Sequence, residues 1–119
     1  MKYLLLIYSD EKADANASKE EADAWMGEYF AYTEAMRKAG VSTAGEALHP
    51  TSSATTVRVK NGKTVTTHGP FAETKEQLGG YYVLDCKNLD EAIEWAAKCP
   101  GARVGSIEIR PVMEFDQAQ

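Results

Sequence analysis

The segment from Ser18 to Gly40 constrains the fold most, because it carries a start signal, a periodic apolar face and a stop signal for one long helix. Ser18 and Glu21 form a capping-box pattern, in which each side chain satisfies a backbone N–H of the first turn. Gly40 favours the left-handed conformation that ends helices. A helix over 18–39 is therefore predicted, with one face formed by Ala22, Met26, Tyr29, Thr33 and Met36.

Strand-like segments lie on both sides of this helix. The apolar run 1–8 is bounded by polar residues, which is typical of a central strand with both faces covered. Segment 41–48 reads as a short strand in which Gly45 marks a bulge or a close backbone approach. Two further strands are predicted at 81–85 and 106–112.

A hairpin and a second helix complete the pattern. Residues 55–60 and 63–67 alternate Thr and Val with polar residues around Asn61-Gly62, the strongest short-range signal for a hairpin turn. Residues 72–77 are compatible with one polar helical turn. A second helix begins at Asn88 or Asp90 and ends near Cys99-Pro100-Gly101.

This order predicts a single α+β domain over residues 1–119, with a ferredoxin-like βαββαβ layout and a hairpin inserted before the fourth core element. Both helices should cover one face of an antiparallel sheet. The other face would be exposed in a monomer, so a homodimer that packs sheet on sheet is expected. The sequence leaves open which of two alternating sets of residues forms this exposed face. The first set is Tyr3, Leu5, Ile7, Tyr82, Leu84, Ile107 and Ile109, and the second set consists of the residues between them.

Composition and spacing exclude several classes of protein. The net charge is −5 and no cluster of Lys and Arg occurs, so nucleic acid is not an expected partner. No apolar stretch is long enough to span a bilayer, and we expect a cytoplasmic protein with Cys86 and Cys99 as reduced thiols. Neither a metal-ligand spacing nor a nucleotide-binding or serine-hydrolase motif is present, so no metal and no cofactor are expected.

The string GPFAETKEQLGGYY at residues 69–82 is similar to the motif that names the DGPF domains, a branch of the YCII-related family. The likeness extends over MKYLLLIY (1–8), AGEAL (44–48), LDEAIEWAAKCP (89–100) and IEIRPVMEF (107–115). The resemblance implies a dimeric ferredoxin-like barrel with cavities between the sheet, the first helix and the motif loop. The wider YCII group includes a dehydrochlorinase-type enzyme, and DGPF proteins are associated with sigma-factor regulation, so the resemblance implies one of these kinds of role.

Two positions depart from the family pattern. His68 stands where the motif has its aspartate, so the role of this position is open. Relatives in the wider group pair a histidine of the first helix with an aspartate in a proposed catalytic dyad, but residues 18–39 contain no histidine. That dyad is not carried over to this chain.

The motif loop contains the first candidate residues. Glu73 and Glu76 lie about one helical turn apart with Lys75 between them, and mutual repulsion of the two carboxylates would make one of them an acid or base. Gly69 and Phe71 are candidate ligand contacts of the same loop. A solvated polar turn explains these residue types equally well.

His68 is a candidate for proton exchange with a substrate above Gly69, since histidine titrates near neutral pH. In the alternative interpretation, His68 only forms hydrogen bonds with its neighbours in the turn.

Aromatic residues and strand ends provide the remaining candidates. Trp25 and Tyr29 form an aromatic edge that either faces a ligand or belongs to the core. Tyr8, Glu46 and Arg110 would together bind a carboxylate or phenolate substrate, although a Glu–Arg pair that joins strand ends uses the same residue types.

Two functions remain open from the sequence. One is a cofactor-independent enzyme of proton transfer or elimination, acting on a small polar or aromatic substrate between Trp25, Tyr29 and the 68–76 loop. The other is a non-catalytic module that binds a metabolite or regulates a partner.

Overall fold

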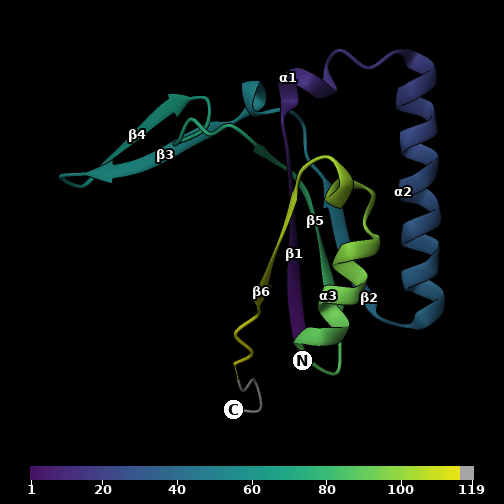
Figure 1. Ribbon diagram of the computed structural model, residues 1–119. Helices are drawn as coiled ribbons and strands as arrows, with labels where there is room; N and C mark the ends of the chain where they lie inside the picture. The colour runs from purple at the N-terminus through teal and green to yellow at the C-terminus, as the bar shows by residue number, and fades with distance from the viewer. Residues whose placement is uncertain (116–119) are drawn as a thin grey trace.

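The computed structural model describes residues 1–115. Its main sheet is antiparallel and has the strand order β2-β5-β1-β6. The helices α2 (Lys19–Ala39) and α3 (Leu89–Lys98) lie on the same side of this sheet (Figure 1). The α+β, ferredoxin-like fold predicted from the sequence is thereby confirmed. The four strands are β1 (Lys2–Ser9), β2 (Ser42–Ala47), β5 (Gln77–Asp85) and β6 (Ser106–Pro111).

Helix α2 begins and ends where its capping residues predict. The Ser18 side chain accepts a hydrogen bond from the Glu21 backbone N–H at 3.1 Å, and the Glu21 carboxylate accepts one from the Ser18 N–H at 3.0 Å. Gly40 has a φ of 73°, a left-handed conformation that glycine adopts without a steric penalty. Within the described residues no helix combines the length and apolar character needed to cross a membrane.

The segment before β5 differs from the prediction, because residues 72–76 form no helical turn. The Thr74 hydroxyl donates to the Glu76 carbonyl at 2.6 Å, and the Gln77 amide donates to the Thr74 carbonyl at 2.6 Å. Such local side-chain bonds compete with helical ones. Strand β5 also begins earlier than predicted, since Gln77 and Leu78 already pair with β1 across a bulge at Gly79.

Several short elements were not predicted. They lie in the connections between the longer elements, and each is too short to give a periodic sequence signal. They are α1 (Glu11–Asp14), η1 (Thr51–Ser53) and η2 (Pro100–Arg103).

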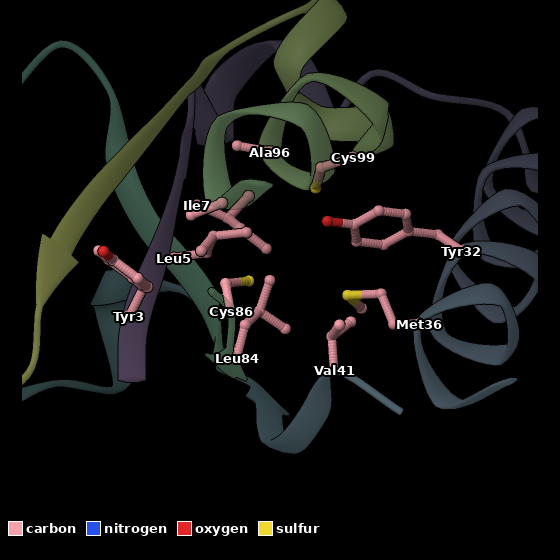
Figure 2. Close-up of a cluster of buried hydrophobic side chains, with 11 residues drawn as sticks. Tyr3, Leu5, Ile7, Tyr32, Met36, Val41, Leu84, Cys86, Ala96 and Cys99 are labelled. Atoms are coloured by element: carbon pink, nitrogen blue, oxygen red, sulfur yellow. The ribbon is translucent and has the colours of Figure 1, made fainter. Parts of the chain in front are cut away.

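The core lies between the sheet and the C-terminal half of α2. Tyr32 and Met36 reach from α2 toward Leu84 and Leu5 of the sheet (Figure 2). The Tyr32 hydroxyl donates to the Trp95 carbonyl of α3 at 2.8 Å, which ties the two helices together. Both cysteines are free and buried in this core, in agreement with the prediction.

The structure decides which set of sheet residues faces the helices. Tyr3, Leu5 and Ile7 of β1 and Leu84 of β5 are buried against them. The opposite set forms an open face of the sheet, which we define by Leu4, Leu6, Tyr8, Leu78, Tyr81 and Val83.

The inserted hairpin is a separate two-stranded sheet of β3 (Thr55–Lys60) and β4 (Lys63–His68). It projects away from the main sheet on the side opposite α2 (Figure 1). Every residue of β4 is exposed, as are Val57 and Val59 of β3. The radius of gyration is 16.6 Å, whereas a compact chain of this length would have about 13.5 Å. We call residues 55–68 the arm.

Candidate functional site

A cavity of about 660 Å³ lies between the N-terminal half of α2 and the sheet. Only the C-terminal half of α2 is packed into the core, since Met36 is fully buried whereas Met26 is 56% exposed. Aromatic side chains of α2 form one wall, with Tyr82 of β5 on the sheet side. The wall residues on α2 are Trp25, Met26, Tyr29 and Phe30.

The cavity exists because the sheet carries very small residues opposite these large ones. Gly45 and Ala47 of β2 pair with Tyr82 and Gly80 of β5, on the face that is turned toward α2. A Cβ atom at Gly80 would lie 3.0 Å from the Glu46 carbonyl oxygen, tighter than an ordinary contact. The missing side-chain volume leaves space between the sheet and the helix unfilled at this end.

Two tyrosines place hydroxyl groups at the inner end of the cavity. The Tyr29 hydroxyl accepts a hydrogen bond from the Gly101 N–H at 3.1 Å, and the Cys99 thiol donates to it at 3.6 Å. The hydroxyls of Tyr82 and Thr33 are 2.9 Å apart. Burial raises the pKa of both phenols, so they stay protonated at neutral pH. They are hydrogen-bonding groups rather than bases.

The mouth of the cavity is held by α1 and η1. The Glu11 carboxylate accepts bonds from the Thr51 N–H at 2.8 Å and from the Thr51 hydroxyl at 2.7 Å. The Gln77 side chain accepts from the Glu11 N–H at 2.9 Å. Asp14, also at the mouth, accepts from the Ser9 hydroxyl at 2.7 Å. These contacts join three segments that are far apart in the sequence.

Three of the predicted site residues border this cavity, namely Trp25, Tyr29 and Glu46. Pairing with Tyr81 turns the Glu46 side chain to the opposite face of the sheet, so only Trp25 and Tyr29 direct side chains toward the cavity. The structure also adds residues that sequence reasoning missed. Two features of the sequence together were the signal for them. Residues 45, 47, 79 and 80 are small, and the aromatic face of the first helix is wider than packing on one sheet requires. Among the missed residues are Glu11, Asp14, Met26, Phe30, Thr33, Ala47, Leu48, Gly80 and Tyr82.

The motif loop lies elsewhere, because none of residues 68–76 lines the cavity. His68 pairs with Thr55 at the base of the arm. Phe71 is 80% exposed, and Glu73 and Lys75 are also exposed. Glu76 accepts a hydrogen bond from the Ser106 hydroxyl at 2.8 Å and so contacts β6. Gly69 donates its N–H to the Ala54 carbonyl at 2.7 Å, which closes the arm.

The expected meeting of Tyr8, Glu46 and Arg110 does not occur. Glu46 lies on β2 and Arg110 on β6, which are the two opposite edges of the sheet. At about 4.8 Å between neighbouring strands, these edges are too far apart for a contact. Tyr8 instead has Arg110 and Glu108 near it, and its pKa is raised by partial burial and then by Glu108.

Comparison with known proteins agrees with this architecture. The family model of the YCII-related domain matches residues 1–116. The chain belongs to the YCII-related domain family. A relative in Rhizobium meliloti (strain 1021) is 41% identical over 114 residues, which cover 94% of this chain and 92% of the relative. That protein is described as uncharacterised, so the family assignment identifies no function, and the function has to be inferred from the geometry of the site.

Gly45→Ala is expected to lower the free energy of unfolding by about 1–3 kcal/mol, because a Cβ atom there would lie 2.6 Å from Cδ1 of Tyr82. The Tyr82 ring must move, and its hydrogen bond with Thr33 is lost. Urea denaturation measures the change. Gly27→Ala is the matched control, since no atom lies within 4 Å of its Cβ position. Because Gly27 lies in the interior of a helix, Gly27→Ala should raise the free energy of unfolding by about 0.5–1 kcal/mol. Equal stability of the two variants would contradict the role of Gly45.

Proposed function

We propose that this YCII-related protein binds a small molecule with an aromatic or apolar body in the cavity between α2 and the sheet. The observation that carries the proposal is a space of about 660 Å³ with aromatic walls and a few hydroxyl groups at its inner end. Its volume falls within the range of small-molecule sites, which are mostly apolar with a small number of orienting polar groups.

Binding without conversion is the function that this geometry supports best. The phenols of Tyr29 and Tyr82 have raised pKa values and remain neutral, so they can orient a ligand but do not remove a proton from it. The ionisable residues of the motif loop, His68, Glu73 and Glu76, lie outside the cavity lining.

A thermal-shift screen against metabolites and small aromatic compounds tests the proposal, because a ligand of the folded state raises its apparent stability. Ala47→Trp, which places an indole on the cavity side of β2, should remove most of the shift. Ala24→Trp on the exposed side of α2 is the control and should retain it. A shift that survives Ala47→Trp unchanged would place the ligand elsewhere.

A cofactor-independent enzyme of proton transfer or elimination is the second candidate. The motif loop favours it, because His68, Glu73, Lys75 and Glu76 gather acidic and basic groups within one short segment. Turnover of a bound compound, lost in Glu73→Ala or His68→Ala, would establish this candidate. Saturable binding without conversion, unchanged in both variants, supports the binding module.

We further propose that the protein forms a homodimer. The open face of the sheet carries a continuous set of partly exposed apolar side chains, among them Leu4, Leu6 and Val83. The arm adds Val57 and Val59, which are 58% and 69% exposed. A second copy of the chain would cover both surfaces, and apolar burial of this kind is the main driving force for association.

A further inference from the structure

We propose that the ligand of the α2–sheet cavity carries a positively charged amine on its aromatic or apolar body. This inference rests on the proposed function, and it adds the charge of the ligand to its size and shape. It comes from the distribution of charged residues around the cavity, which is far from even.

The described residues that line the cavity include no Lys or Arg, although the chain has 13 of these residues. They do include the carboxylates of Glu11 and Asp14 at the mouth and one imidazole, that of His49. Glu46 also borders the cavity, but its pairing with β5 turns its side chain to the open face of the sheet. A ligand that carries a carboxylate or phosphate would therefore meet repulsion at the mouth and find no guanidinium or ammonium partner. A carboxylate or phenolate ligand, which the sequence left open through Arg110, fits poorly because Arg110 lies on the far edge of the sheet.

The N-terminus of α2 does not substitute for a basic side chain. A free helix N-terminus attracts anions through its unpaired N–H groups. Here the capping box of Ser18 and Glu21 pairs N–H groups of the first turn, and Glu20 and Glu21 add negative charge to it. None of residues 18–21 lines the cavity, so this end of the helix offers an anion no site there.

The aromatic walls favour a cation as well. Ammonium groups are attracted to the faces of Trp, Tyr and Phe rings. The protein already uses this interaction twice, since Arg103 lies 5.4 Å from the Trp25 ring centre and Lys98 lies 4.8 Å from that of Trp95. Arg103 is also paired with Glu28 at 2.6 Å, so its charge is neutralised. An amine between the carboxylates of the mouth and the cavity rings would meet both kinds of partner.

Three indole probes of similar size test the inference: tryptamine, which is cationic, tryptophol, which is neutral, and indole acetate, which is anionic. Isothermal titration calorimetry at low salt measures their dissociation constants. Tryptamine is expected to bind about tenfold more tightly than tryptophol, and indole acetate more weakly than either. Added salt should reduce the preference.

A matched pair of variants locates the preference. Glu11→Gln combined with Asp14→Asn removes both carboxylates of the mouth, keeps side-chain oxygens that can accept the hydrogen bonds from Thr51 and Ser9, and should abolish the advantage of tryptamine. Asp90→Asn combined with Glu94→Gln changes the net charge equally on α3 and should leave it intact. Equal binding of tryptamine and tryptophol would overturn the charge preference while the cavity remains a binding site. If none of the three indoles binds, the proposed function itself fails and the inference with it.

Discussion

Raising the pH from about 8 to about 12 is expected to unfold this protein cooperatively. Five acidic groups near the core have raised pKa values, in each case mainly because burial disfavours the charged form. They are the phenols of Tyr29, Tyr32 and Tyr82 and the thiols of Cys86 and Cys99.

The direction of the effect follows from proton binding. In the unfolded chain a thiol loses its proton near pH 8.5 and a phenol near pH 10, both approximate values. The folded protein keeps these protons at higher pH, so deprotonation stabilises the unfolded state. Stability is therefore fully present below about pH 8 and decreases above it, first through the thiols and then through the phenols. Each group lowers the free energy of unfolding by up to about 1.4 kcal/mol per pH unit.

These groups act together against a total stability of roughly 5–15 kcal/mol for a domain of this size. Far-UV circular dichroism and tyrosinate absorbance, followed in the same titration, should change at the same pH. Tyr32→Phe removes one titrating group and should reduce the pH slope by about one proton. It also removes the hydrogen bond to the Trp95 carbonyl, at a cost of about 1 kcal/mol at every pH. Ionisation of all the tyrosines near pH 10 without loss of helix would contradict the burial of these phenols.

The sequence predicted those elements whose ends are set by contacts between residues that are close in the sequence. Ser18, Glu21 and Gly40 specify the ends of α2 through their own backbone contacts, and these ends appear in the structure as expected. The turn at Asn61-Gly62 specifies the hairpin in the same way, since both residues adopt positive φ angles of 51° and 76°. The apolar run 1–8 predicted a central strand, but only the packed structure decided that Leu5 faces the helices.

The cavity could not be predicted in this way, because it depends on the distance between α2 and the sheet. Apolar periodicity placed Met26 and Met36 on one face of the helix and gave no signal that their burial would differ. The structure buries Met36 fully and leaves Met26 56% exposed, because Gly45, Ala47 and Gly80 supply no side-chain volume beneath the N-terminal half. Similarly, the sequence could not show that the motif loop lies outside the cavity, since sequence proximity to Gly79-Gly80 suggested the opposite.

The arm raises a separate question of stability. A two-stranded hairpin is marginally stable in water when nothing packs on it. The pairing of β3 with β4 places Val57, Val59, Thr64 and Thr66 on one face of the arm. The opposite face carries Val65 among basic residues, and the arm as a whole contains no Asp or Glu although the chain has a net charge of −5. The rest of the molecule is therefore strongly acidic, and a second copy of it complements the arm in charge.

Replacing both Val57 and Val59 by threonine is expected to raise the dissociation constant of the homodimer by roughly tenfold to a hundredfold. Threonine keeps the branched shape and the strand preference of valine, so the hairpin still forms. It puts a hydroxyl group in place of a methyl group that association would bury, which costs free energy only in the dimer. Sedimentation equilibrium over a dilution series gives the dissociation constant.

Val65→Thr makes the same chemical change on the opposite face of the arm, next to Arg58 in the cross-strand pairing. It should leave the dissociation constant within about twofold of the starting protein if only the Val57 face packs on the second copy. Equal weakening by both changes would mean that the arm acts through hairpin stability instead. A chain that stays monomeric at all concentrations would reject the homodimer, and the exposed valines of the arm would then require a different partner to cover them.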